Sequence, residues 1–433
     1  MLWLLRQRQG QSEEEVPAMH QIELPALEAV VTLNPCPTPP PVPVVTTAAP
    51  VRAHQSLYID AGDCLYAVSA ADGTARWCQQ AKLIRTREVI YPPEVSVPPP
   101  PRVHFATPRV VGDVNGVVYV CIDGFGSYTC AFNAGNGSLR WWTPTDAGVM
   151  SMPFMDWAVP LVNDGIVYSG TYALSAQDGT VLWRIAIDTH EEGTVALPAL
   201  ADETIYAATH RGIYAISAQD GRIRWLYQPE NLNLLSGPPV VAGRLLYAGT
   251  RTGFAEPMRS HRAVQRIHDA RSGTGDSVAY QETGYFCALD VETGAEVWRY
   301  PIGGYIGAVV QDETIYVSSG DRTLSARDTK SGVLRWQHQF AAPGHYPATI
   351  AQNGLYLTTD GAYALSSEDG AVLWHQSMGS NPGVSFRQPV VLDGAVYLVR
   401  FDKRARGVLY ALDRRDGVEC WHIPAVFAVA VAQ

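Results

Sequence analysis

The cysteines are the residues whose spacing most directly suggests chemistry. Cys64 and Cys78 flank one expected hairpin and Cys121 and Cys130 flank a second, each pair almost symmetrically about its turn. Opposed positions on neighbouring strands bring Cβ atoms to about 5 Å, close to the geometry of a disulfide. Two such disulfides would indicate an oxidising compartment. Cys36, Cys287 and Cys420 belong to neither pair. The alternative is that all seven cysteines are small, buried hydrophobic side chains.

Signatures of common catalytic sites are missing from the sequence. There is no Gly-x-Ser-x-Gly elbow, no P-loop and no His-Glu-x-x-His helix. The cluster Thr189-His190-Glu191-Glu192 contains potential metal ligands, but no further ligands can be named to complete a site. The segment Met150–Trp157 is either an adaptable sticky patch or a plug over a central channel. We therefore assign no catalytic residue and no metal ligand.

Basic residues concentrate in three stretches, 79–107, 251–284 and 400–406. Together these hold 13 basic and 7 acidic residues, although the whole chain carries a net charge of −10. A positive surface on an acidic body would attract an anionic partner, whereas the alternative is ordinary solvated loop charge. The residues that we single out as a candidate partner face are Arg85, Arg87, Arg259, Arg262, Arg266, Lys403, Arg404 and Arg406.

The composition excludes several classes of protein. With 47% hydrophobic and 17% charged residues, the chain has ample apolar surface for a folded core. The acidic balance argues against a dedicated nucleic-acid binder. No apolar run approaches the roughly 18 to 20 residues that a membrane helix needs. Leu2–Leu5 is too short for a signal-peptide core, so no export signal is visible. We expect a soluble chain that is a monomer.

One repeated motif must position all of these residues. The pattern Ala-x5-Gly-x3-Trp occurs eight times without an internal gap, and an apolar run containing a Tyr precedes each copy. Successive motif tryptophans lie 38 to 73 residues apart, and the shorter spacings match a four-stranded propeller blade. The motif tryptophans are Trp77, Trp141, Trp183, Trp225, Trp298, Trp336, Trp374 and Trp421.

Each motif predicts a hairpin within a four-stranded meander. Tyr172–Ser175 is a short strand, Asp178-Gly179 a tight turn and Val181–Trp183 the start of the returning strand. A single such sheet cannot bury both faces, whereas eight arranged radially can. We therefore predict an all-β protein, an eight-bladed β-propeller of four-stranded antiparallel blades. Each motif Trp should fill the gap to the next blade, where its N–H reaches a neighbouring carbonyl.

This architecture brings the basic stretches to one face. In a meander, the connections after the second and the fourth strand emerge on the same side of the blade. The three basic stretches are all long connections of these two kinds, so they project together. Because loops on a rigid scaffold commonly carry function, we expect this insertion face to bind the partner.

The Tyr-Ala-Leu-x4-Gly-x3-Trp repeats resemble those of the pyrroloquinoline-quinone (PQQ) repeat propellers, from residue 51 to about residue 424. In that superfamily, quinoprotein dehydrogenases hold PQQ and calcium on the axis, and other members are non-enzymatic, such as the lipoprotein of the outer-membrane assembly machinery. The dehydrogenase resemblance would imply an adjacent Cys-Cys pair, which is missing here, and none of its calcium or catalytic motifs can be matched.

The resemblance thus favours a non-catalytic scaffold that binds a protein or another macromolecule, with no cofactor. The alternatives are a PQQ- and calcium-dependent dehydrogenase and an extracytoplasmic sensor module. The resemblance also implies an extracytoplasmic location.

The two ends of the chain leave open how the ring closes. We divide the chain into an amino-terminal tail, residues 1–50, with a Pro-rich linker from residue 35, and a propeller, residues 51–433. Either residues 50–53 or the apolar segment Val426–Val431 can supply the innermost strand of the first blade.

Overall fold

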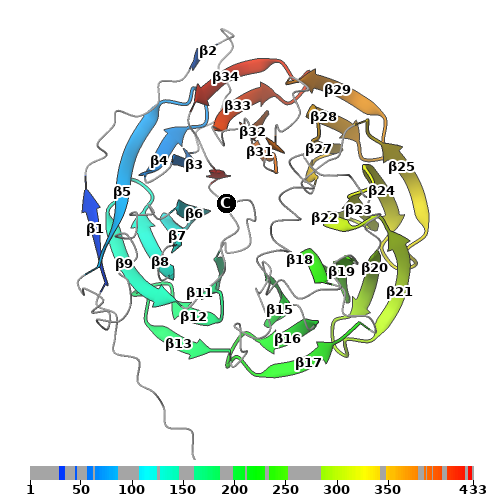
Figure 1. Ribbon diagram of the computed structural model, residues 1–433, viewed down its shortest axis with the longest axis horizontal. Helices are drawn as coiled ribbons and strands as arrows, with labels where there is room; N and C mark the ends of the chain where they lie inside the picture. Colours follow the sequence, from blue (N-terminus) through cyan, green and yellow to red (C-terminus); the bar gives the residue numbers. More distant parts are fainter. Residues whose placement is uncertain are drawn as a thin grey trace, which may run out of the picture.

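The computed structural model describes a backbone of strands joined by tight turns. The described residues are 29–34, 44–45, 56–61, 64–85, 107–123, 127–145, 160–185, 198–209, 212–229, 234–251, 284–341, 348–378, 385–386, 388–392, 394–401, 407–424 and 428–431. No helix occurs within these ranges, and the strands form eight antiparallel sheets. Figure 1 shows the sheets arranged radially around one axis, which confirms the predicted eight-bladed propeller.

In blades 2 to 8 four strands follow one another in the chain, the first nearest the axis and the fourth on the rim (Figure 1). Blade 2 contains β6 (Thr107–Val114), β7 (Val117–Asp123), β8 (Ser127–Asn133) and β9 (Leu139–Thr145). Blade 3 contains β10 (Leu161–Asn163), β11 (Ile166–Ser169), β12 (Tyr172–Ser175) and β13 (Val181–Arg184). Blade 4 contains β14 (Ala199–Ala201), β15 (Thr204–Ala208), β16 (Ile213–Ser217) and β17 (Ile223–Tyr227).

The second half of the ring continues in the same way. Blade 5 contains β18 (Leu234–Ala242), β19 (Leu245–Arg251), β20 (Gly284–Asp290) and β21 (Glu296–Ile302). Blade 6 contains β22 (Tyr305–Gln311), β23 (Thr314–Ser319), β24 (Thr323–Asp328) and β25 (Leu334–Gln339). Blade 7 contains β26 (Thr349–Ala351), β27 (Gly354–Thr358), β28 (Gly361–Ser366) and β29 (Val372–Ser377). Blade 8 contains β31 (Val390–Leu392), β32 (Ala395–Phe401), β33 (Gly407–Asp413) and β34 (Glu419–Pro424), and the short β30 (Ser385–Phe386) also pairs with β32.

Blade 1 is assembled from both ends of the sequence. β3 (Ser56–Ala61), β4 (Cys64–Ser69) and β5 (Ala75–Arg85) form its outer three strands. Its innermost strand is β35 (Ala428–Val431), which pairs with β3. The carboxyl-terminal segment is therefore the one that closes the ring, and residues 50–53 lie outside the described residues.

Two short segments of the amino-terminal tail, residues 29–34 and 44–45, are described, and both pair with strands of the propeller. β1 (Ala29–Asn34) pairs with β5 on the outside of blade 1. β2 (Val44–Val45) pairs with β34 on the outside of blade 8. The tail thus adds an outer strand to each of the two blades that meet at the closure.

The motif residues form a row across each blade. Tyr206, Ala215 and Trp225 lie opposite one another on β15, β16 and β17. Because Ala215 carries only a methyl group, the rings of Tyr206 and Trp225 come together beside it, with centroids 5.8 Å apart. The other pairs are Tyr58–Trp77, Tyr119–Trp141, Tyr168–Trp183, Tyr247–Trp298, Tyr316–Trp336, Tyr356–Trp374 and Tyr397–Trp421.

The hydrophobic core is a ring of contacts between neighbouring blades. Eight clusters of buried residues occur in the described part of the chain, and each joins residues of two adjacent blades. One cluster, for example, packs Tyr206 and Ile213 of blade 4 against Leu246 and Leu289 of blade 5. The free energy of burial is therefore available only when neighbouring blades are assembled.

Candidate functional site

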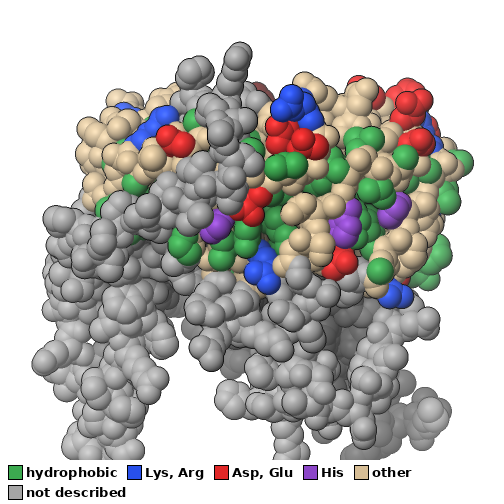
Figure 2. Space-filling view, turned by 90° about the horizontal axis from the view of Figure 1, so that it is seen from above, with side chains coloured by type: hydrophobic (Ala, Val, Ile, Leu, Met, Phe, Trp, Pro, Cys, Tyr) green, Lys and Arg blue, Asp and Glu red, His purple; other side chains and the backbone are tan. Residues whose placement is uncertain are grey.

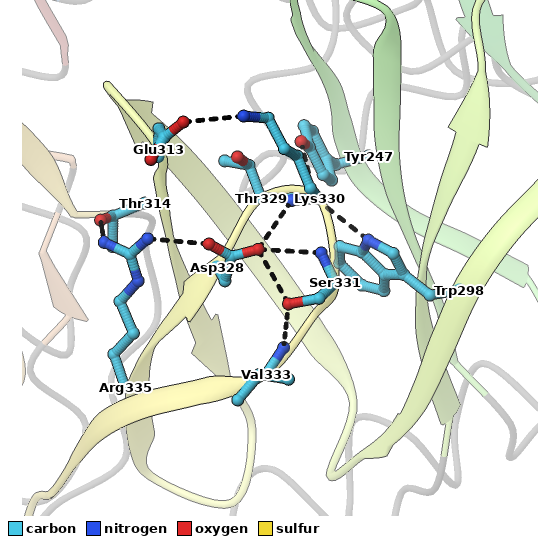
Figure 3. A network of polar contacts seen from close by, with 10 residues as sticks. All are labelled: Tyr247, Trp298, Glu313, Thr314, Asp328, Thr329, Lys330, Ser331, Val333 and Arg335. Carbon is cyan, nitrogen blue, oxygen red and sulfur yellow. Dashed lines mark hydrogen bonds and ion pairs between the residues drawn. The ribbon is translucent and has the colours of Figure 1, made fainter.

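The junction between blades 5 and 6 shows how one blade holds the next (Figure 3). The indole N–H of Trp298 donates a hydrogen bond to the carbonyl oxygen of Thr329, at 3.0 Å. The hydroxyl of Tyr247 donates to the same oxygen at 3.2 Å, and burial raises the pKa of this phenol to about 12. Gly332 lies against the indole, because a Cβ placed there would come within 2.9 Å of a Trp298 ring carbon. The motif glycine thus leaves room for the indole of the preceding blade and also adopts the positive φ that its own turn needs.

Asp328 organises the hairpin that receives this indole (Figure 3). Its carboxylate accepts hydrogen bonds from the backbone N–H groups of Lys330 and Ser331, at 3.1 and 2.9 Å. Arg335 donates to the other carboxylate oxygen at 2.8 Å. These contacts, the one with Arg335 foremost, hold the pKa of Asp328 well below its usual value. The charged form of Asp328 therefore fixes the turn on which Thr329 and Gly332 stand.

The same docking contact recurs around the ring. Seven of the eight motif tryptophans donate their N–H to a carbonyl in the hairpin of the next blade, at 2.8 to 3.2 Å. The indole N–H of Trp183 is buried without a partner, although its ring lies against Gly221. The acceptors, in chain order, are the carbonyls of Ala134, Ala176, Val291, Thr329, Ser367, Arg414 and Ala71.

The tyrosine hydroxyls share this role, which sequence reasoning had not assigned to them. Four of the five tyrosine hydroxyls donate to the carbonyl that the Trp of the same blade uses or to the adjacent one, whereas Tyr168 bonds Ala218 although Trp183 makes no such bond. The fixed place of a Tyr ahead of every motif was the available signal. The hydroxyls of Tyr168, Tyr206, Tyr247, Tyr316 and Tyr397 donate to the next blade at 2.8 to 3.4 Å.

The three connections that contain the basic stretches begin at one face of the ring. Antiparallel pairing brings the ends of every second and fourth strand to the same side, and β5, β19 and β32 end there at Arg85, Arg251 and Phe401. Blades 1 and 8 are neighbours, whereas blade 5 stands across the ring from them (Figure 1). Arg85 is the last residue of β5, and the other predicted partner residues, Arg87, Arg259, Arg262, Arg266, Lys403, Arg404 and Arg406, lie outside the described residues.

The opposite face, which we call the hairpin face, is closed by tight turns that satisfy their own polar groups. Asp220 accepts the backbone N–H of Arg222 at 3.2 Å, and Asp72 accepts that of Thr74 at 3.0 Å. Hydrogen bonds from Ser217 and from Arg222 lower the pKa of Asp220. In Figure 2, side chains of Lys, Arg, Asp and Glu gather along the upper edge of the molecule. This face therefore offers short, internally bonded turns rather than extended connections.

The rim between the two faces exposes aliphatic side chains. Val333 and Leu334, at the start of β25, and Val372 and Leu373, at the start of β29, are 44 to 63% exposed; Val333 immediately precedes its strand. Hydrophobic side chains are correspondingly visible along the flank in Figure 2. The row is interrupted by polar and charged side chains, as expected of a solvated outer strand.

The cysteines correct one prediction. Cys121 and Cys130 are buried thiols without a disulfide, so the possible disulfide between them is not formed. Cys121 lies opposite Thr129, so Cys130, one position further along its strand, points to the other face of the sheet. Cys121 contacts Ser169 of blade 3 at 3.2 Å, whereas Cys130 packs with Tyr58 and Leu65 of blade 1. Cys78 is disulfide-bonded, and the side chain of Cys64, its expected partner, lies outside the described residues.

Two other candidate sites fall outside the described residues, namely Thr189–Glu192 and Met150–Trp157. Among the described residues, no three His, Cys, Asp or Glu side chains are grouped so that they could hold a metal ion. In the same part of the chain, no helix is long and apolar enough to cross a membrane.

Comparison with known families assigns the repeats. The family model described as outer membrane protein assembly factor BamB matches residues 61–300 and 282–428. The chain belongs to this family. Its repeats are thus PQQ-like propeller repeats of the BamB type, closer to that branch than to the quinoprotein dehydrogenases.

Individual BamB relatives are distant. The outer membrane protein assembly factor BamB of Yersinia pestis is 24% identical over 325 residues, which are 71% of this chain and 59% of that protein. The BamB of Shewanella oneidensis is 26% identical over 40% of this chain and 48% of its own length. A serine/threonine-protein kinase, AfsK of Streptomyces griseus, is 31% identical over 27% of this chain and 15% of its own. This chain thus spans 15 to 59% of the length of these relatives.

Solved structures support the fold alone. Dihydro-heme d1 dehydrogenase NirN aligns with a TM-score of 0.56 at 14% identity, over 93% of this chain and 79% of that one. The quinohemoprotein alcohol dehydrogenase of Comamonas testosteroni aligns with a TM-score of 0.53 at 14% identity, over 74% and 67%. At such identities the same propeller serves proteins with different activities.

Proposed function

We propose that this protein is a non-catalytic scaffold in the assembly of outer-membrane proteins, and that it binds a protein partner through its insertion face. It acts outside the cytoplasm, as a monomer. Membership of the BamB family supports the process, and the arrangement of the connections supports the face.

The observation that carries the choice of face is the contrast between the two ends of the blades. β5, β19 and β32 all end at the insertion face. β5 and β19 lead into long connections, residues 86–106 and 252–283, and β32 leads into a short one, residues 402–406, in which three of the five residues are basic. On the hairpin face, by contrast, the turn carboxylates are already occupied by their own backbone N–H groups. An acidic partner surface would be drawn to the basic side chains of these connections, and its association would weaken as salt rises.

Deletion of residues 255–280 tests the assigned face. These residues lie between β19 and β20, which remain paired with each other, so the blade should keep its fold. Partner capture is measured by chemical crosslinking in isolated cell envelopes, followed by purification of this chain and identification of the crosslinked proteins. We expect an unchanged thermal unfolding midpoint and the loss of crosslinked partners. Capture that survives the deletion would show that the face is wrong.

A charge-reversal pair separates charge from loop length. The first variant replaces Arg259, Arg262 and Arg266 with Glu, and we expect it to lower capture about tenfold at low salt. Its control replaces Arg222, Arg244 and Arg415 on the hairpin face with Glu. The side chains of these three arginines are 70 to 86% exposed. Because exposed ion pairs contribute little to stability, this control should fold and capture partners normally. Equal losses in both variants would mean that only net charge matters.

A further inference from the structure

The outer edges of the blades lie at the rim, and two of these edges are covered. β1 pairs antiparallel with β5 of blade 1, and β2 pairs antiparallel with β34 of blade 8 (Figure 1). Among the described residues, the outermost strands of the other six blades pair only with the strand inside them. Such an edge presents unpaired backbone N–H and C=O groups, to which an extended chain can add as a further strand.

Proteins commonly protect open edges with charged residues or proline. The structure describes all eight outermost strands, and seven of them contain at least one such residue, namely β5, β9, β13, β17, β21, β25 and β34. The outermost strand of blade 7, β29, has the sequence Val-Leu-Trp-His-Gln-Ser and contains neither. β29 is therefore the outermost strand that lacks this protection.

The backbone groups of β29 that face away from the blade can be identified from blades 3 and 6. The N–H groups of Ile185 and Phe340, two and four residues after their motif Trp, donate to carbonyls at the start of the third strand of the same blade. Because N–H groups alternate in direction along a strand, those one and three residues after the Trp point outward. In β29 these positions are His375 and Ser377.

The pairing of β2 shows where an added strand lies. β2 pairs with β34 opposite Trp421 and His422. His422 directly follows its motif Trp, as His375 follows Trp374 in β29. The covered edge of blade 8 and the open edge of blade 7 therefore offer equivalent backbone positions, and the two blades are neighbours in the ring (Figure 1).

The edge of β29 is preformed and bordered by apolar side chains. The buried Trp374 donates its N–H to the Arg414 carbonyl of blade 8 at 2.8 Å, which holds the strand in place. Val372 and Leu373, where the strand begins, are 46 and 58% exposed. The register shift of the blade lies at Leu373, so the regular edge runs from Trp374 to Ser377. A preformed edge loses little conformational freedom on binding, and the aliphatic side chains add apolar contact.

We propose that the rim edge of β29 binds an extended segment of another protein, which adds to the four strands of blade 7 as an antiparallel outer strand. The segment that fits is uncharged and rich in β-branched residues, as are the sequences of β1, Ala-Val-Val-Thr-Leu-Asn, and β2, Val-Val. It pairs with the backbone of His375 and Ser377 and contacts Val372 and Leu373.

The covered edges of blades 1 and 8 favour this occupant over a second copy of the chain. Each of them is covered by a single extended segment rather than by the edge of another folded sheet. β1 and β2 are already paired, so the segment at β29 comes from another protein. The β29 edge lies on the rim, so binding there does not depend on the insertion face.

Peptide binding tests the edge. The probe is a fluorescein-labelled synthetic peptide with the sequence of residues 29–34, and its binding to the full-length protein is measured by fluorescence anisotropy. Hydrogen exchange followed by mass spectrometry then locates the bound peptide. We expect saturating peptide to slow the exchange of residues 372–377 about tenfold and to leave the inner strands of blade 4 unchanged. Absence of binding, or slowed exchange at another outermost strand in place of β29, would overturn the proposal.

A proline variant tests the backbone pairing. Ser377→Pro places at this edge the residue that blades 2, 5 and 8 already have three positions after the motif Trp, as Pro144, Pro301 and Pro424, so the blade should keep its fold. We expect about tenfold weaker peptide binding, because an outward N–H is lost. The control, Gln339→Pro, changes the equivalent position of β25 and should bind the peptide as the unaltered chain does. Thermal unfolding midpoints verify the fold of both variants, and equal affinities in the two would contradict the proposal.

A charged variant provides a test that leaves the backbone intact. Leu373→Arg introduces the arginine that blades 1, 2, 4 and 6 have directly before the motif Trp, and we expect it to weaken peptide binding about fivefold. The control, Leu182→Arg, makes the same change at the equivalent position of β13 and should leave the affinity unchanged. A loss in the control but not in Leu373→Arg would assign the peptide to blade 3 and refute the proposal.

Sedimentation velocity without peptide distinguishes a second copy from a foreign segment. We expect the unaltered chain and Ser377→Pro to sediment alike, as monomers. A dimer of the unaltered chain that Ser377→Pro dissociates would show that the edge pairs with a second copy, and the proposed occupant would then be wrong.

Discussion

At the scale of single residues, the motif is explained by contacts between blades rather than within them. Ala leaves room for the Tyr and Trp rings to meet, and Gly leaves room for the indole of the preceding blade. The Trp298 indole illustrates the combination, since it stacks near Gly332 and also donates to the Thr329 carbonyl. One residue therefore contributes both burial and a hydrogen bond to the same junction.

Trp183 allows these two contributions to be separated. Trp298→Phe should cost about 1 kcal/mol more of unfolding free energy than Trp183→Phe, because only Trp298 loses a hydrogen bond. Trp298→Ala should cost about 3 to 5 kcal/mol, because it also leaves a cavity. Urea unfolding followed by circular dichroism measures all three. Equal costs for the two Phe variants would show that the N–H bond contributes nothing to docking.

At the scale of the element, the hairpin turns depend on ionised aspartates. The pKa values of Asp72, Asp178, Asp220, Asp328 and Asp413 are all lowered from 3.8. Their common cause is hydrogen bonding of the carboxylate within its own hairpin, which favours the charged form. The hairpins that receive the indoles are therefore coupled to pH.

Protonation of Asp328 in acid should lower the free energy of unfolding. Because the folded pKa of Asp328 lies below the unfolded value of 3.8, its contribution is fully present above about pH 5 and is lost as pH falls below 3.8. Asp328→Asn should therefore destabilise the protein at pH 7 and flatten the fall in stability between about pH 5 and pH 2. Urea midpoints across this pH range provide the measurement. An unchanged slope in the variant would exclude Asp328 as a contributor.

Sequence reasoning predicted the blades well because the repeat encodes local strands and their packing partners together. It could not decide whether Cys121 and Cys130 form a disulfide, since symmetry about a turn does not fix register, and one residue changes the face of the sheet. It also missed β1 and β2, which lack the motif and become strands only beside an edge that the folded blades supply. The candidate partner face stays a prediction, because it depends on connections rather than on the repeat.

At the scale of the whole molecule, stability depends on closing the circle. Blade 8 docks on blade 1 through the Trp421 N–H to the Ala71 carbonyl, at 3.1 Å, and through Tyr397 to Ala70, at 2.8 Å. β35 completes blade 1 from inside, and Leu57 and Ile59 of its neighbour β3 are fully buried. The junction of blades 8 and 1 is thus held both by the docking of Trp421 and Tyr397 and by the pairing of β35 with β3.

Truncation after Pro424 should open this junction. Loss of β35 removes the hydrogen-bonded neighbour of β3, so we expect a lower urea midpoint and a broader, less cooperative transition. The control removes only residues 432–433, which lie beyond β35. Both variants are compared by urea unfolding and by small-angle X-ray scattering. An identical transition in the two truncations would show that β35 is dispensable for closure.

The order in which the chain is made gives the pairing of β35 a further consequence. A ribosome delivers β3 early and its inner neighbour only after the seven other blades, so the first sheet must wait with an unsatisfied backbone edge. Such an edge can recruit strands from other nascent chains. The first sheet therefore cannot receive its innermost strand before β35 has been synthesised, whereas each of blades 2 to 8 receives its four strands from one continuous part of the chain.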